Sequence, residues 1–184
     1  TGTISLADTS ATLVLSDGIS FGTAFTVSDT GGEKVLQLQN GTTNTGTYSG
    51  AIAVNETTAG SFDISSNSTG GDFSYNQILT ISGDITSTAG AGVDIIGDGV
   101  VRLTGNNNIT GTVNISNRGS KLRVGNDNAL GTADVLINNR AAELQLEDGI
   151  TIANDLTFTG ESNVTKQITV HDGNDGVAES ATAS

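Results

Sequence analysis

Apolar residues two positions apart recur along this chain at nearly constant intervals. Because side chains alternate between the two faces of a strand, each pair marks one face of a short β-strand. One series has steps of 22, 21, 22 and 24 residues and consists of Leu79/Ile81, Val101/Leu103, Leu122/Val124, Leu144/Leu146 and Ile168/Val170. The other has steps of 20, 22 and 21 residues and consists of Val93/Ile95, Val113/Ile115, Val135/Ile137 and Leu156/Phe158. Two strands per repeat predict an all-β fold, a parallel β-helix (β-solenoid) with about 20–22 residues per coil.

The N-terminal part of the chain, 1–75, carries similar pairs at less regular intervals. Ile4 to Phe25 is 21 residues and Leu13 to Leu36 is 23, whereas Phe25 to Ile52 is 27. We therefore expect a solenoid over residues 1–172, with irregular coils of two strands each over 1–75 and regular coils over 76–172. Residues 173–184 are mostly small and polar, which is typical of a tail or linker.

The composition fits a narrow aliphatic core with polar turns. Hydrophobic residues make up 35% of the 184 residues and aromatic residues 4%, and there are 25 glycines. Proline, cysteine, methionine and tryptophan are absent, so no disulfide can contribute to stability. Stacking of the coils must supply that stability.

The charge of the chain limits its partners. The formal net charge is −13, which argues against nucleic acid because phosphate binding needs a basic surface. Residues 101–140 form a basic belt of net charge +3 between acidic flanks. No run of eighteen apolar residues occurs, so we expect no membrane insertion by this segment.

Residues 99–137 resemble a known repeat. Leu103-Thr104-Gly105-Asn106-Asn107-Asn108-Ile109-Thr110-Gly111 precedes an alternating strand, and Leu122-Arg123-Val124-Gly125 then leads to Ala129-Leu130-Gly131. This pattern is similar to the autotransporter-associated β-strand repeat of large bacterial surface proteins. Ile109 stands where that family usually has an aromatic residue. The resemblance implies a β-helix outside the cell, in the passenger region of an adhesin or secreted protein.

The residues of this motif have physical roles in a stack. Asn106, Asn107 and Asn108 lie between two strands, where asparagine side chains can form ladders from coil to coil. We expect positive φ angles at the glycines that bracket the strands, and a small apolar plug from Ala129 and Leu130. The bracketing glycines are Gly105, Gly111, Gly125 and Gly131.

A search for catalytic groups predicts a protein that is not an enzyme. Asp134 and Asp155 align on adjacent coils at a distance compatible with a glycosidase pair, but they only flank strand starts and have no aromatic residue near them in the sequence. His171 is the only histidine, so the sequence predicts neither a zinc site nor a nucleophilic triad. We predict no catalytic residue.

Two sets of charged residues remain as candidates for binding. Arg102 and Arg123 are predicted to stack on adjacent coils, with Lys121 over Glu143, and these three basic residues form a candidate surface contact for an anion or a uronic acid, the alternative being a solvated face. Calcium is a possible cofactor, with Asp127, Asp172 and Asp175 as candidate ligands on glycine-bearing turns, the alternative being ordinary turns.

Three functions are compatible with such a stack. The first is a non-catalytic extracellular stalk or contact segment of a larger bacterial surface or secreted protein, whose partners are neighbouring repeats, copies of itself, or host and matrix glycans and proteins. Its contacts would use side loops such as 40–47 and 65–72. The second is a self-assembling subunit of an extracellular filament, because an uncapped solenoid end exposes strand edges, and a terminal strand at Thr3–Leu6 could be donated to the next copy. The third and weakest is a β-helical enzyme that acts on polysaccharides.

Overall fold

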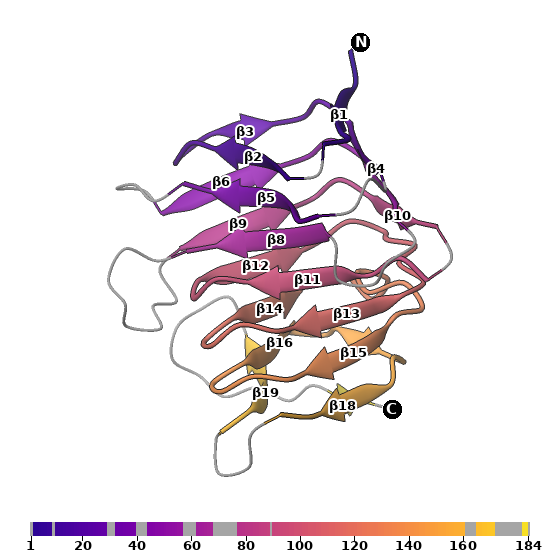
Figure 1. Cartoon of the computed structure of the whole chain (residues 1–184). Helices are drawn as coiled ribbons and strands as arrows, with labels where there is room; N and C mark the ends of the chain where they lie inside the picture. The colour runs from indigo at the N-terminus through magenta and orange to yellow at the C-terminus, as the bar shows by residue number, and fades with distance from the viewer. Residues whose placement is uncertain are drawn as a thin grey trace.

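The computed structural model describes residues 2–8, 10–28, 32–39, 44–56, 62–67, 77–88, 90–160, 165–171 and 182–183. All paired strands in these ranges are parallel, and there is no helix among them. Figure 1 shows the chain winding through stacked coils, with β1 to β3 at one end and β18 and β19 at the other. The predicted all-β parallel solenoid is confirmed.

One long wall, sheet B, contains the second predicted series of strands. Its seven strands are β2 (Ala11–Leu15), β5 (Lys34–Leu38), β8 (Phe62–Ser66), β11 (Val93–Ile96), β13 (Thr112–Ile115), β15 (Asp134–Ile137) and β18 (Leu156–Phe158). Val113 pairs with Val93 on one side and with Val135 on the other, as the sequence spacing predicts.

The other long wall, sheet C, contains the first predicted series. Its seven strands are β3 (Ser20–Phe21), β6 (Thr45–Tyr48), β9 (Ile78–Ile81), β12 (Val100–Leu103), β14 (Lys121–Val124), β16 (Glu143–Glu147) and β19 (Gln167–His171). Leu122 pairs with Val101 and with Leu144, so successive coils lie directly on one another in the predicted register.

A third wall, sheet A, corrects the expectation of two strands per coil in the first half of the chain. Its four strands are β1 (Ile4–Leu6), β4 (Phe25–Ser28), β7 (Ile52–Asn55) and β10 (Ile85–Ser87). The apolar pairs of residues 1–75 therefore belong to sheets A and B. The sheet C strands of these coils escaped detection because Thr45-Gly46-Thr47-Tyr48 has no aliphatic pair.

The spacing of the early coils is also less regular than that of the later ones. In sheet B Leu36 pairs with Ile64, 28 residues further along the chain, and Lys34 pairs with Phe62. Tyr48 pairs with Phe21 on one side and with Ile81 on the other, and both intervals in the chain exceed those of the regular coils. The early coils are therefore longer than the predicted repeat.

Between Ser87 and Thr151 the third side continues as turns and not as strands. Thr86 forms an isolated parallel bridge with Asn108, and the Asn108 N–H donates to the Ile85 carbonyl at 2.8 Å. The Asn107 N–H donates in turn to the Asn128 carbonyl at 3.1 Å. Backbone hydrogen bonds thus still join one coil to the next along this side.

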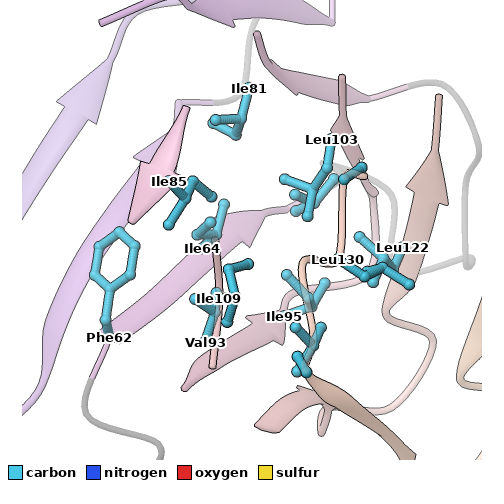
Figure 2. Close-up of a cluster of buried hydrophobic side chains, with 14 of the residues drawn as sticks. Phe62, Ile64, Ile81, Ile85, Val93, Ile95, Leu103, Ile109, Leu122 and Leu130 are labelled. Atoms are coloured by element: carbon cyan, nitrogen blue, oxygen red, sulfur yellow. The ribbon is translucent and has the colours of Figure 1, made fainter. Parts of the chain in front are cut away.

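The interior between the three sides is a continuous column of buried apolar side chains. Figure 2 shows Ile85 of β10 and Ile109 of the following turn directed into the same interior as Ile64 and Ile95 of sheet B. Ile109, Ala129 and Leu130 are fully buried, which confirms the predicted apolar plug. Burial of such side chains is the main stabilising contribution in a fold without disulfides.

The motif glycines and asparagines have roles that differ partly from prediction. Of the four bracketing glycines only Gly131 has a positive φ, of 57°. At Gly105 an added Cβ would lie against the Gly83 carbonyl, so close approach of two coils, and not φ, requires glycine there. Gly83 lies in the same way against the Gly50 carbonyl, which makes a column of glycines at one corner of the stack.

In the described part of the chain the asparagine side chains bond mainly to the backbone of neighbouring coils. One amide-to-amide contact, from Asn138 Nδ2 to Asn114 Oδ1 at 3.3 Å, joins two coils, but it lies outside the stretch 106–108 where the ladder was predicted. Asn107 accepts from the Ile85 N–H through Oδ1 at 2.8 Å and donates from Nδ2 to the Ala129 carbonyl at 2.6 Å. This buried side chain therefore connects three coils.

A fourth, two-stranded sheet involves the end of the chain. Here β20 (Thr182–Ala183) pairs with β17 (Thr151–Ile152). The two residues of β20 belong to the stretch predicted as a polar tail or linker, and they can pair in this way because parallel pairing needs only backbone groups. Residues 172–181 and 184 lie outside the described residues. In the described ranges no helix is long and apolar enough to cross a lipid bilayer.

Candidate functional site

The outer face of sheet C carries a groove of about 590 Å³, here called the sheet C groove. Its lining comes from six consecutive strands, β6, β9, β12, β14, β16 and β19, and from the residue after β16. The groove is lined by Thr45, Gly46, Thr47, Ile78, Thr80, Arg102, Arg123, Glu147, Asp148 and His171. Five coil steps of about 4.8 Å give it a length of roughly 24 Å along the stack.

The charged centre of the groove is an ion pair between strands that are not neighbours. Arg102 donates from Nε to Glu147 Oε1 at 2.5 Å and from Nη2 to Glu147 Oε2 at 2.7 Å. Such a two-pronged contact is the strongest arrangement for a guanidinium and a carboxylate. The hydrogen bond to Glu147 raises the pKa of Arg102, and both side chains remain partly exposed, at 32% and 22%.

Arg123 lies between these two residues in the stack. It pairs in register with Arg102, as the sequence predicts, and with Gln145 on the other side. Its Nε donates to Gln145 Oε1 at 2.9 Å. Arg123 was predicted as part of a surface contact; only 7% of the residue is exposed, and that part lines the groove.

Lys121 is not a surface contact. It is 2% exposed, and its Nζ donates to the carbonyl oxygens of Gly119 at 3.0 Å and Asp98 at 3.2 Å. Burial lowers the pKa of Lys121, while the charges of Glu143 and Asp98 act in the opposite direction. Its in-register pairing with Glu143 is confirmed, and its described contacts hold a corner of the stack.

The candidate calcium ligand Asp127 has a structural partner. Its Oδ1 accepts the N–H of Thr151 on the next coil at 2.9 Å. Asp127 also lines a second hollow, of about 540 Å³, together with Asp134 and Asp155. Within the described ranges no group of three or more His, Cys, Asp or Glu side chains is arranged to hold a metal ion. Asp172 and Asp175 lie outside those ranges, and calcium at these positions stays a prediction.

The aligned pair Asp134 and Asp155 lies at the start of adjacent coils, where the Val135 N–H donates to the Asp155 carbonyl at 2.8 Å. Asp134 and Asp155 are both exposed. His171 is at the end of β19, where it pairs with Glu147 and lines the sheet C groove. The structure thus places the single histidine in the same groove as the two arginines that the sequence singled out.

Sequence reasoning missed a buried acidic stack on sheet B. Asp63 and Asp94 are in-register neighbours, and Asp63 is 6% exposed. Burial, a hydrogen bond with Glu33 and the charges of Asp94, Glu33 and Glu56 together raise the pKa of Asp63 to about 8. Nearby, Lys34 and Glu56 form an ion pair of 3.0 Å that is almost fully buried. The long interval in the chain between Asp63 and Asp94, outside the regular repeat, hid this stack.

The fold defines the class of protein, which is a β-solenoid of parallel coils. A long polar groove lies on the outer face of sheet C. Comparisons with protein-family models, with curated proteins and with solved structures found no match.

Proposed function

We propose that the chain is a non-catalytic structural and contact segment of a larger bacterial surface or secreted protein, in which the stacked coils act as a stiff spacer. The observation that carries this proposal is the unbroken in-register stack of seven strands in each long sheet. Each added coil lengthens such a stack by about 4.8 Å, so reach grows with repeat number. The resemblance of residues 99–137 to a surface-protein repeat supports the location outside the cell.

The distribution of exposed apolar side chains also supports a spacer. Among the described residues, the large hydrophobic side chains that are exposed belong to the first and last coils: Val14 at 49%, Ile19 at 47%, Phe158 at 49% and Ile168 at 38%. Phe158 and Ile168 occupy inward positions of the last coil. A further coil stacked on the last one would bury Phe158 and Ile168, in the same way as the last coil buries Ile137 and Leu144.

Duplication of whole coils tests the spacer role. Residues 100–142 contain two coils, since Val100 pairs with Lys121 and Lys121 with Glu143. A second copy of this segment is expected to lengthen the particle by about 10 Å in small-angle X-ray scattering, with an unchanged cross-section. A glycine- and serine-rich insertion of equal length at the same position is the control. Equal scattering profiles for the two insertions would contradict the proposal.

The location is tested on intact cells of the source. Antibodies against the purified chain should label these cells before permeabilisation. Labelling only after permeabilisation would refute the surface location while leaving the spacer geometry intact.

A filament subunit is the second candidate, favoured by the edge positions that β2 and β3 at one end and β18 and β19 at the other hold among the described strands of the two long sheets. Exposed edges and apolar ends invite a further copy. Electron microscopy of the purified chain separates the two functions, because single short rods support the spacer and fibres support the filament.

A further inference from the structure

The shape of the sheet C groove indicates an extended ligand. A volume of about 590 Å³ is distributed over strands from β6 to β19, so the groove is long and narrow. It crosses the sheet obliquely, from Thr45 at the start of β6 to His171 at the end of β19. A linear polymer lying along the stack fits this shape better than a small compact molecule.

The lining favours a glycan over a peptide. Threonine hydroxyls line the end of the groove near the first coils, guanidinium groups its middle, and a carboxylate and an imidazole its far end, with Ile78 as the largest apolar side chain. Peptides are usually held by apolar pockets or by a free strand edge. The strands from β6 to β16 are paired on both sides, so they offer no such edge.

The middle of the groove is suited to a carboxylate. The guanidinium of Arg102 is directed at a carboxylate within the groove, that of Glu147, and Arg123 is the adjacent in-register residue. Glu147 therefore marks the position and orientation that a ligand carboxylate would take. Arg102 is 32% exposed, which leaves the guanidinium accessible from solvent.

We propose that the sheet C groove binds a linear, uronate-bearing glycan, one carboxylate of which replaces Glu147 at Arg102. The hydroxyl groups of Thr47 and Thr80 bond to sugar residues further along the chain. Glu147 holds Arg102 in place when no glycan is bound and competes with the ligand carboxylate. This inference deepens the contact role in the proposed function and rests on it, because a spacer on a cell surface meets acidic matrix glycans.

Isothermal titration calorimetry of the full chain with hexagalacturonic acid tests the proposal. Arg102→Gln should weaken binding about tenfold or more, since a charge-assisted pair is lost. Arg118→Gln is the matched control, because it removes the same charge from an exposed turn outside the groove, and binding should change less than about twofold. Glu147→Gln should strengthen binding several-fold by removing the competing carboxylate.

A second variant tests the length of the site. Thr80→Val keeps the side-chain volume. This variant should bind hexagalacturonic acid several-fold more weakly, while its affinity for digalacturonic acid should not change. Circular dichroism melts confirm that each variant is folded. Equal losses for Arg102→Gln and Arg118→Gln would overturn the proposal, as would equal affinity for maltohexaose or for hexaglutamate. Such a failure leaves the scattering result on coil duplication unchanged, so the spacer role is judged separately.

Discussion

Both halves of the stack enclose an apolar core, but their coils differ in the number of strands and in length. In the first half each coil has three strands, and the chain travels far between paired residues, as from Phe21 to Tyr48 and from Tyr48 to Ile81. In the second half sheets B and C continue, but the third side consists of turns as far as the short strand β17, and the steps are shorter, as from Val93 to Val113. The interiors differ accordingly.

The longer coils enclose aromatic side chains. Phe25 packs against Tyr48 and Phe62 with ring centroids 5.2 and 5.8 Å apart, in edge-to-face arrangements. The buried apolar side chains described after residue 77 are all aliphatic. The two long sheets therefore run through the whole solenoid, while the third side differs between the halves and sets the width of the core.

The largest expected effect concerns the third side itself. Ile52 of β7 and Leu130 of a turn are both fully buried. If the turn side is core and not a mere connection, Ile52→Ala and Leu130→Ala should each destabilise the protein by about 2–5 kcal/mol. Chemical denaturation measures both. A cost below about 1 kcal/mol for Leu130→Ala alone would show that the turn side is dispensable.

The next effect tests the junction between the halves. Asn107 connects the last strand of sheet A to two turns of the second half. Asn107→Ala leaves the Ile85 N–H and the Ala129 carbonyl without this partner in a buried site, at a cost of about 2–4 kcal/mol. The exposed neighbour Asn106 provides the control, since Asn106→Ala should cost much less in the same denaturation experiment.

The glycine column is a feature that both halves share. An Ala side chain at Gly83 would collide with the Gly50 backbone, so Gly83→Ala should cost about 1–3 kcal/mol. Gly2→Ala places its Cβ in open space and serves as the control. Equal melting temperatures for the two variants would mean that adjacent coils can separate at this corner without penalty.

The smallest effect is a pH dependence confined to the first half. The pKa of Asp63 is about 8 in the folded protein and near its ordinary value of 3.8 when unfolded. Between these two pH values the folded state binds more protons than the unfolded state does. The contribution of Asp63 to the free energy of unfolding is therefore fully present below about pH 4 and is lost as the pH rises toward 8. Asp63→Asn should flatten this dependence and stabilise the protein at pH 8 by about 1 kcal/mol or more. Denaturation at pH 5 and pH 8 gives the sign, and a steeper fall in the variant would contradict the assignment.

The sequence allowed prediction of the fold class and of the register in residues 76–172, because regularly spaced aliphatic pairs such as Leu122/Val124 mark inward positions on both long sheets. Sheet A was harder to recognise, since only one apolar residue, Ile85, marks β10. The stacking of Arg102 on Arg123 followed from the same spacing. The pairing of Arg102 with Glu147 did not, because it joins strands two coils apart and depends on side-chain length and direction.

The pairing of Arg102 with Glu147 has a consequence for how the rod unfolds. In an ordinary repeat array each unit senses only its immediate neighbours, so the ends fray one unit at a time. Here a bridge passes over β14 and fastens β12 to β16. Unfolding of β16 therefore also removes a partner from β12. The three coils that contain β12, β14 and β16 are thus expected to unfold together as one cooperative unit.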